Sequence, residues 1–284
     1  MTSNASATPL RPAALRTREQ FTAAYDNAAA VPAGAAIVAA LRARGDALAA
    51  RSRVQADQRY GALPRQRYDW YAAADADAPV LVFVHGGYWQ ARDKRDFSAV
   101  GAGALRAGLH VVHGEYTLAP QAGIGDMVAE IGQLLDALAA HPVLGRGQRL
   151  VLCGHSAGGH LAAMQRAHPA VAAVLAISGL FDLEPIRRGA LNDALQPDAA
   201  AVQACSPLRR IGAGAPTVVA FGDAELPELQ RQSRDYAAAL GAAGQALRRI
   251  EVPGADHYTI LAALERDDGV LLEQIVALAA GVER

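Results

Sequence analysis

The stretch from Gly154 to Gly159, GHSAGG, constrains this chain more than any other part of its sequence. It follows the apolar run RLVLC (149–153), which is typical of a buried strand, and leads into the helix-favouring LAAM (161–164). A G-x-S-x-G sequence between a strand and a helix indicates a nucleophile elbow, a sharp and strained turn in which side chains on the flanking glycines would collide. We therefore expect Ser156 to lie at a strand end and a helix start, where free N–H groups favour developing negative charge.

A second motif, HGGYW (85–89), follows the fully apolar run PVLVFV (79–84). Such a run is typical of a parallel strand that is buried on both faces. Hydrolysis of an ester or amide generates an oxyanion, and backbone N–H groups held in place stabilise it. We expect the N–H groups of Gly86 and Gly87, together with that of Ala157 after the serine, to form this oxyanion hole.

Two aromatic residues, Tyr88 and Trp89, end the second motif. Aromatic residues make up only 5% of the chain, so an adjacent pair beside the oxyanion loop favours a substrate pocket over ordinary core packing. We expect both side chains to line the pocket for the acyl group. His85, by contrast, is expected to fix its loop by hydrogen bonding.

A serine nucleophile needs a histidine base and a carboxylate that orients the base. With a nucleophile elbow, the expected chain order is serine, acid, histidine. His257 is the only histidine after His168, and it lies in a loop between a strand pattern (245–252) and a helical run that starts near Ile260. We therefore expect His257 to be the base.

The carboxylate should follow the preceding strand pattern, residues 215–221. The next residues, GDAELPE, offer Asp223, Glu225 and Glu228. Glu228 is expected to belong to a helix that starts at or after Pro227, where a carboxylate complements the helix dipole. Spacing alone does not separate Asp223 from Glu225.

These motifs together resemble those of the serine-dependent kynurenine formamidases (arylformamidases), which carry an HGGxW signature and are relatives of the hormone-sensitive-lipase branch of α/β hydrolases. The similarity covers most of the chain and also includes YDN (25–27), SGLFDL (178–183) and PELQRQS (227–233). In that family the triad acid stands six residues before the Arg of an Arg-Gln pair, and counting back from Arg231 gives Glu225 in place of the usual aspartate. A second departure is EYTLAP (115–120), where relatives show DYRLAP.

The resemblance implies a serine hydrolase that cleaves a small acyl group from an aryl formamide or ester, with N-formylkynurenine as the family's substrate. Ser156 would attack the carbonyl, His257 would carry the proton, and Glu225 would orient His257. A short-chain carboxylesterase shares this machinery and is an alternative. A non-catalytic ligand-binding protein of the same fold is an alternative from another class, which the intact Ser156 and His257 argue against.

Strand and helix patterns alternate along the chain, which predicts an α/β fold with a mostly parallel central sheet flanked by helices. We expect residues 1–18 to form a flexible lead and residues 19–284 a single α/β-hydrolase domain, with its sheet beginning near Arg67. Helical segments over about 19–53 and the irregular stretch 180–207 are expected to form a small lid. A helix packed on the sheet is predicted by apolar residues at helical spacing: Met127, Ile131, Leu134, Leu135 and Leu138.

Composition favours a cytoplasmic enzyme that binds a small molecule. The formal net charge of −1 gives no indication of a nucleic-acid or membrane partner. Cys153 and Cys205 are expected to be reduced thiols, and the first residues lack the apolar core of a signal peptide. The eight histidines show no H-x-x-x-H or H-E-x-x-H spacing, so we expect no metal and no other cofactor. The sequence is compatible with a homodimer.

Overall fold

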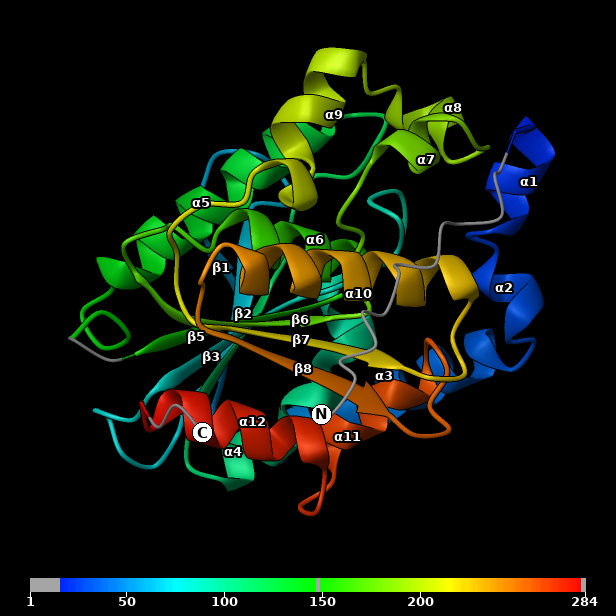
Figure 1. The fold of residues 1–284 in the computed structure, drawn as a ribbon. Helices are drawn as coiled ribbons and strands as arrows, with labels where there is room; N and C mark the ends of the chain where they lie inside the picture. Colours follow the sequence, from blue (N-terminus) through cyan, green and yellow to red (C-terminus); the bar gives the residue numbers. More distant parts are fainter. Residues whose placement is uncertain (1–15, 147–148, 282–284) are drawn as a thin grey trace, which may run out of the picture.

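The computed structural model describes residues 16–146 and 149–281 of the chain. Its centre is one eight-stranded sheet with the order β1-β2-β4-β3-β5-β6-β7-β8 (Figure 1). Neighbours from β4 to β8 pair in parallel, whereas β2 pairs antiparallel with both β1 and β4. The strands are β1 (Val54–Arg59), β2 (Arg67–Tyr71), β3 (Val80–Val84), β4 (His110–Gly114), β5 (Leu150–His155), β6 (Val171–Ile177), β7 (Thr217–Gly222) and β8 (Leu247–Val252).

The expected α/β architecture is confirmed, but the sheet begins one strand earlier than expected. β1 pairs with β2 at the edge of the sheet, and its side chains are half-buried or exposed on both faces. Its sequence, VQADQR, therefore lacks both the apolar run of a central strand and the alternation of a strand with one buried face. The fully buried strands β3, β5 and β7 were recognisable because every one of their residues is shielded from solvent.

Helices cover both faces of the sheet (Figure 1). The helices α5, α6 and α10 pack on one face, and α3, α4, α11 and α12 on the other. The five apolar residues that predicted a helix lie in α5 and are fully buried. The helices are α1 (Arg18–Ala23), α2 (Asn27–Ala30), α3 (Gly34–Ala49), α4 (Ala102–Arg106), α5 (Ile124–Ala139), α6 (Ala157–Met164), α7 (Glu184–Arg187), α8 (Asn192–Leu195), α9 (Ala199–Cys205), α10 (Pro227–Ala242), α11 (Ala262–Glu265) and α12 (Val270–Ala279), with 3-10 turns η1 (Lys94–Gly101), η2 (Pro207–Arg209) and η3 (Thr259–Leu261).

The strand order places a crevice at the carboxyl ends of β3 and β5. After β3 the chain adds β4 on one side, and it then returns to add β5 on the other side. The connections that follow these two strands therefore leave the sheet toward opposite faces, which opens a crevice at their carboxyl ends. The GHSAGG and HGGYW motifs follow these two strands, so the topology brings the two motifs together.

The N-terminal boundary differs from the expected flexible lead of residues 1–18. Thr17 caps α1 through a capping box with Gln20, and Arg18 forms an ion pair with Asp193 of α8, 2.6 Å between Nη2 and Oδ2. Residues 17 and 18 thus belong to the folded domain, because caps and ion pairs hold them there. The rest of the expected lead, residues 1–15, lies outside the described residues.

The two expected lid segments lie side by side. Helix α1 contacts α7, and the hydroxyl of Thr22 accepts a hydrogen bond from the Ala190 N–H at 3.0 Å. Figure 1 shows α1 and α2 at the same end of the molecule as α7 and α8. The N-terminal helices and the 184–205 helices therefore form one joined layer at the rim of the domain.

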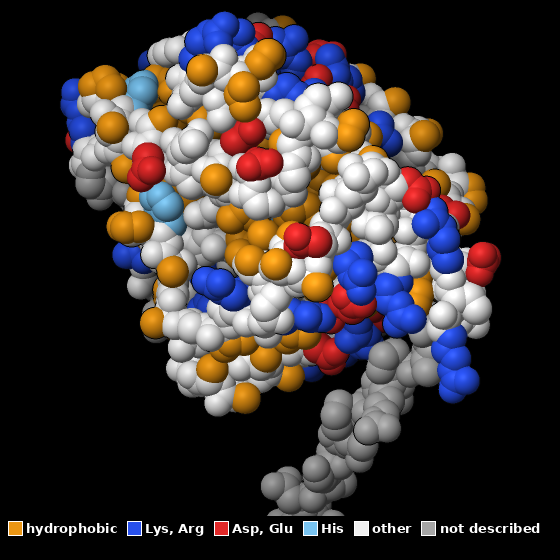
Figure 2. Space-filling view, turned by 90° about the horizontal axis from the view of Figure 1, so that it is seen from above, with side chains coloured by type: hydrophobic (Ala, Val, Ile, Leu, Met, Phe, Trp, Pro, Cys, Tyr) orange, Lys and Arg blue, Asp and Glu red, His pale blue; other side chains and the backbone are white. Residues whose placement is uncertain are grey.

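The outer surface of one face carries charges of both signs. Figure 2 shows Lys and Arg side chains lying among Asp and Glu side chains in mixed clusters, beside a central area of hydrophobic side chains. This pattern agrees with the formal net charge of −1. No helix within the described ranges, 16–146 and 149–281, is long and apolar enough to cross a lipid bilayer.

Candidate active site

Ser156 lies on a strained turn between β5 and α6. Its backbone angles, φ 58° and ψ −119°, fall where residues other than glycine are rarely found. The flanking glycines leave no room for side chains: a Cβ on Gly154 would lie 2.1 Å from the Gly158 carbonyl oxygen, and one on Gly158 would lie 2.0 Å from the Val84 carbonyl oxygen. The sequence G-x-S-x-G therefore forms the expected elbow because its glycines permit this close approach of backbone.

The side chains of Ser156, His257 and Glu225 form a chain of hydrogen bonds. The distance from Ser156 Oγ to His257 Nε2 is 3.0 Å, and that from His257 Nδ1 to Glu225 Oε2 is 2.9 Å. All three residues are buried, so water competes little for these hydrogen bonds. The arrangement brings together a hydroxyl, an imidazole and a carboxylate in the order that nucleophilic catalysis requires.

The structure separates the two carboxylates that spacing left open. Glu225 Oε2 faces His257, while Glu225 Oε1 accepts hydrogen bonds from the Ser178 hydroxyl at 2.6 Å and the Gly222 N–H at 2.7 Å. Asp223 turns elsewhere, and its Oδ1 accepts from the Gly254 N–H at 2.7 Å. Glu225 is therefore the carboxylate that contacts the imidazole.

The third carboxylate of this segment, Glu228, lies in the first turn of α10 as expected, and it also makes contacts outside the helix. It is buried, and its Oε1 accepts a hydrogen bond from the Tyr25 hydroxyl at 2.9 Å. Its Oε2 lies 2.8 Å from Arg231 Nε. Glu228 therefore ties α10 to the N-terminal segment.

The HGGYW loop lies against the elbow. A Cβ placed on Gly86 would be 3.0 Å from Ser156 Cβ, so the loop backbone runs directly beside the serine. None of the hydrogen bonds in the described part of the chain uses the N–H of Gly86, Gly87 or Ala157. The N–H groups of the three expected oxyanion donors thus lie in or beside the turn at Ser156. None of them donates to another backbone acceptor in the described residues.

A buried ion cluster holds this loop in place. His85 Nε2 lies 2.7 Å from Glu115 Oε1, and Arg65 Nη2 lies 2.8 Å from the same oxygen. The His85 ring stacks on Tyr116, with 4.6 Å between ring centroids. Burial alone would raise the pKa of Glu115, but the electrostatic interaction and hydrogen bond with His85, the charge of Arg65 and the hydrogen bond from the Tyr116 N–H outweigh it and hold the pKa below its usual value. The expected structural role of His85 thus has a visible basis.

A small cavity of about 50 Å³ lies beside Ser156. Its walls include Ser156, His257, His155, Tyr88, Asn27 and Tyr258. A larger cavity of about 560 Å³ lies elsewhere, along α4 and α12, but no serine, histidine or cysteine lines it. The residues that line the cavities therefore favour the small cavity as the candidate active site.

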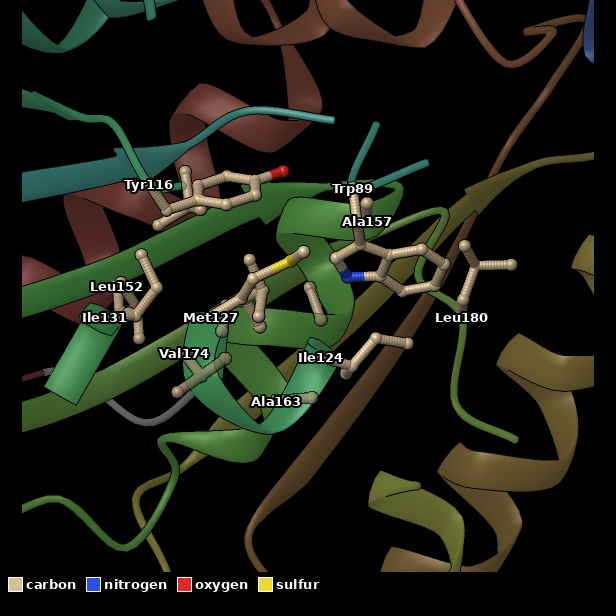
Figure 3. Packing of buried hydrophobic residues seen from close by; sticks show 14 of the residues in the cluster. Trp89, Tyr116, Ile124, Met127, Ile131, Leu152, Ala157, Ala163, Val174 and Leu180 are labelled. Carbon is tan, nitrogen blue, oxygen red and sulfur yellow. The ribbon is translucent and has the colours of Figure 1, made fainter. Parts of the chain in front are cut away.

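Tyr88 lines this cavity as expected, but Trp89 does not. The Trp89 side chain is fully buried, and its Nε1 donates a hydrogen bond to His160 Nδ1 at 3.3 Å. Figure 3 shows the indole among hydrophobic side chains that include Ala157 and Leu180. Both aromatic residues have positive φ, 51° and 60°. Their side chains point to different partners, Tyr88 to Tyr25 and Trp89 to His160.

This chain is similar in sequence and in fold to several known proteins. The family model BD-FAE matches residues 69–173. A kynurenine formamidase from Danio rerio is 29% identical over 79% of this chain and 81% of its own length, and one from Salmo salar is 28% identical over 77% and 80%. A solved structure from Silicibacter sp. TM1040, which carries a provisional thioesterase name, covers 92% of this chain and 98% of its own, with 28% identity and a TM-score of 0.82. The chain has the α/β-hydrolase fold.

The expected fold and the expected relation to the kynurenine formamidases are both confirmed by these similarities. The plant isoprenylcysteine methylesterases form a second group of relatives. One from Oryza sativa is 35% identical over 39% of this chain and 27% of its own length. The α/β hydrolase thus shares sequence with enzymes named for formamide cleavage and with enzymes named for ester cleavage.

Asn27 and His155 are among the residues of the cavity wall that sequence reasoning missed. Asn27 comes from α2, and His155 precedes the nucleophile. Burial, with a contribution from the nearby His257, lowers the pKa of His155 well below its usual value. The YDN segment (25–27) did carry a signal, because it is one of the pieces that resemble the formamidases. Across residues 16–146 and 149–281, no group of three or more His, Cys, Asp or Glu side chains is placed to hold a metal ion.

Proposed function

We propose that this α/β hydrolase cleaves a small acyl group from an aryl formamide or ester through a covalent acyl intermediate on Ser156. The observation that carries the proposal is the continuous hydrogen-bond chain from Ser156 Oγ through His257 to Glu225. Such a chain activates a hydroxyl that is otherwise a weak nucleophile.

The proposed reaction has two halves, acylation of Ser156 and hydrolysis of the acyl-serine, and the same side chains act in both. His257 Nε2 takes the proton of Ser156 Oγ as the oxygen attacks the carbonyl carbon, and the N–H groups of Gly86, Gly87 and Ala157 stabilise the oxyanion. His257 then passes the proton to the leaving nitrogen or oxygen as its bond to carbon breaks. Water repeats these steps on the acyl-serine and releases the acid. Glu225 stays ionised and holds the imidazole with its Nδ1–H toward the carboxylate.

The size of the cavity supports a small acyl group. Pockets for drug-sized ligands span roughly 300–1,000 Å³, whereas the space beside Ser156 is about 50 Å³. A formyl or acetyl group suits this space better than a long acyl chain. The exposed side chain of Arg92 lies in the same wall, which favours a leaving group that carries a carboxylate. N-formylkynurenine combines both features, and the relatives from Danio rerio and Salmo salar carry that family's name.

A short-chain carboxylesterase is the second candidate function. The similarity to isoprenylcysteine methylesterases supports it, because the same serine machinery cleaves esters. Each chemical step is assigned to a residue of the chain itself, so neither candidate invokes a cofactor. Cys153 and Cys205 are buried and unpaired, which supports action in a reducing compartment such as the cytoplasm.

We also propose that the N-terminal helices cover the reaction site. Asn27 of α2 and Val38 of α3 both belong to the cavity wall. The wall contains no residue of the 180–207 insertion, so the insertion would act through its contacts with α1. The joined layer would have to move to admit a substrate larger than the cavity.

Labelling with a fluorophosphonate probe tests the mechanism. We expect the wild-type protein to gain the mass of the probe less HF, because Ser156 Oγ displaces fluoride from phosphorus, and Ser156→Ala to gain none. A wild-type protein that stays unlabelled would contradict the mechanism and favour a non-catalytic binding protein.

Substrate choice is tested by comparing kcat/KM for N-formyl-L-kynurenine with that for p-nitrophenyl acetate on one preparation. We expect a strong preference for the formamide. Good ester turnover with negligible deformylation would leave the mechanism standing and favour the carboxylesterase.

A further inference from the structure

We propose that Asn27 determines substrate selectivity: its side-chain oxygen, together with Nδ1 of His155, accepts hydrogen bonds from N–H groups of the substrate. The site would then select formamides and other N–H-bearing acyl compounds over esters. This inference rests on the proposed hydrolase function of the Ser156 site. It concerns two acceptors that the proposed mechanism does not use.

The orientation of the Asn27 amide follows from its neighbours. The Tyr88 hydroxyl donates its proton to the Tyr25 carbonyl oxygen at 2.6 Å, because a carbonyl can only accept. The Tyr88 oxygen must therefore accept at its other contact, 2.8 Å from Asn27 Nδ2. This places the NH₂ group of Asn27 toward Tyr88 and its Oδ1 away from it. Among the described residues Oδ1 has no hydrogen-bond partner, and Asn27 is only 3% exposed.

The protonation of His155 follows from the same kind of reasoning. Its Nε2 lies 2.8 Å from the His257 carbonyl oxygen, so Nε2 carries the proton and Nδ1 carries a lone pair. Within the described chain Nδ1 has no hydrogen-bond partner. A Cβ on Gly86 would lie 3.3 Å from Nδ1 and 3.0 Å from Ser156 Cβ, so Nδ1 lies beside the oxyanion loop. Burial keeps the imidazole neutral by lowering its pKa, so the lone pair persists at neutral pH.

Both acceptors belong to residues in the wall of the cavity that contains Ser156 and His257. A buried acceptor without a partner is unfavourable, and a ligand that supplies a donor relieves this cost. The amide of a formamide, or an amino group near it, supplies N–H donors. The linking oxygen of an ester supplies none, so an ester leaves the acceptors unsatisfied. Sites of this kind discriminate strongly against analogues that lack the hydrogen-bonding group.

The test compares formanilide with phenyl formate, which differ in having N–H or O at the leaving atom. Each variant is compared with wild type by the ratio of their kcat/KM values on the same substrate, so the different intrinsic reactivities of the two substrates cancel. For Asn27→Ala we expect kcat/KM to fall about tenfold more for formanilide than for phenyl formate, the effect of one hydrogen bond. Asn27→Asp keeps an acceptor oxygen but loses the donor to Tyr88, so it should retain more of the preference for formanilide than Asn27→Ala does.

Asn192→Ala is the matched control. Asn192 Oδ1 is also buried without a partner in the described chain, but Asn192 lies in α8 and outside the cavity wall. Its replacement should leave the ratio of the two rates unchanged. If Asn27→Ala does not fold, Asn27→Leu keeps the side-chain shape without the polar atoms and gives the same readout.

Equal loss on both substrates in Asn27→Ala would overturn the inference and assign Asn27 a structural role only. Failure of the wild-type protein to hydrolyse either substrate would instead contradict the proposed function, so the two failures are distinguishable.

Discussion

Strained backbone gathers around Ser156 at the scale of single residues. Ser156, Ser178, Tyr88 and Trp89 all have φ between 51° and 60°. Each such residue costs roughly 1–3 kcal/mol and persists only where its surroundings hold it. Ser178 is held by its hydrogen bond to Glu225, and Tyr88 and Trp89 by bonds to Tyr25 and His160. Strained residues therefore concentrate near the candidate site, although Asp57 and Gln196 also have positive φ and lie outside its cavity wall.

The acid of the site gives a prediction at this scale. Glu225→Gln removes the negative charge beside His257 Nδ1, so we expect kcat to fall by about 10³–10⁴-fold. Asp223→Asn is the control, because an amide oxygen can still accept from the Gly254 N–H, and it should leave kcat nearly unchanged. Steady-state kinetics on the preferred substrate measures both. A larger loss in Asp223→Asn would move the acid role to Asp223.

The HGGYW loop, which carries the proposed oxyanion donors, depends on contacts between elements. The loop leaves β3, and Glu115, directly after β4, binds His85 of the loop and Arg65 of the segment before β2. Glu115 Oε2 also accepts from the Lys94 N–H at 3.1 Å, at the start of η1. One buried carboxylate thus joins four parts of the chain around the loop that carries the proposed oxyanion donors.

Removing this carboxylate should affect stability and turnover together. Glu115→Ala leaves the buried His85 without its partner, and we expect a loss of about 3 kcal/mol in the free energy of unfolding. We also expect a drop in kcat, since the N–H groups of Gly86 and Gly87 would be less well held. Urea denaturation and steady-state kinetics measure the two effects.

Asp268→Ala provides the control for Glu115→Ala. It breaks an ion pair between two side chains, Arg266 and Asp268, that are 68% and 70% exposed, so it should leave the free energy of unfolding nearly unchanged. Equal costs for the two variants would show that the Glu115 cluster does not hold the loop.

At the scale of the whole molecule, His160 joins three distant segments. It lies in α6, its Nδ1 accepts from Trp89 of the oxyanion loop, and its Nε2 donates to the Cys205 carbonyl oxygen at the end of α9, 2.7 Å away. This pattern requires a neutral ring, because a protonated Nδ1 would face the indole N–H. Burial lowers the pKa of His160 to about 4.

This buried histidine predicts acid sensitivity of the fold. The unfolded chain takes up a proton near pH 6.5 and the folded chain only near pH 4, so His160 contributes full stability above 6.5 and loses it as pH falls toward 4. At pH 5 we expect a loss of about 2 kcal/mol from this group. Urea denaturation at pH 7.5 and pH 5 measures it. His160→Gln does not titrate, so its stability deficit against wild type should narrow at pH 5, and a constant deficit would refute this account.

The sequence by itself predicted the sheet core, the elbow, the histidine that contacts Ser156 and the family relation. Apolar runs and glycine spacing are patterns of neighbouring residues. They predicted the strands β3 and β5 and the turn at Ser156, because a buried strand and a tight turn each require particular residue types at adjacent positions. The tertiary structure decided what depends on distant segments. It chose Glu225 over Asp223, which lie two residues apart and differ only in which one faces His257. It also turned Trp89 into the core and brought Asn27 to the cavity, because the path of the chain through space sets which distant side chains meet.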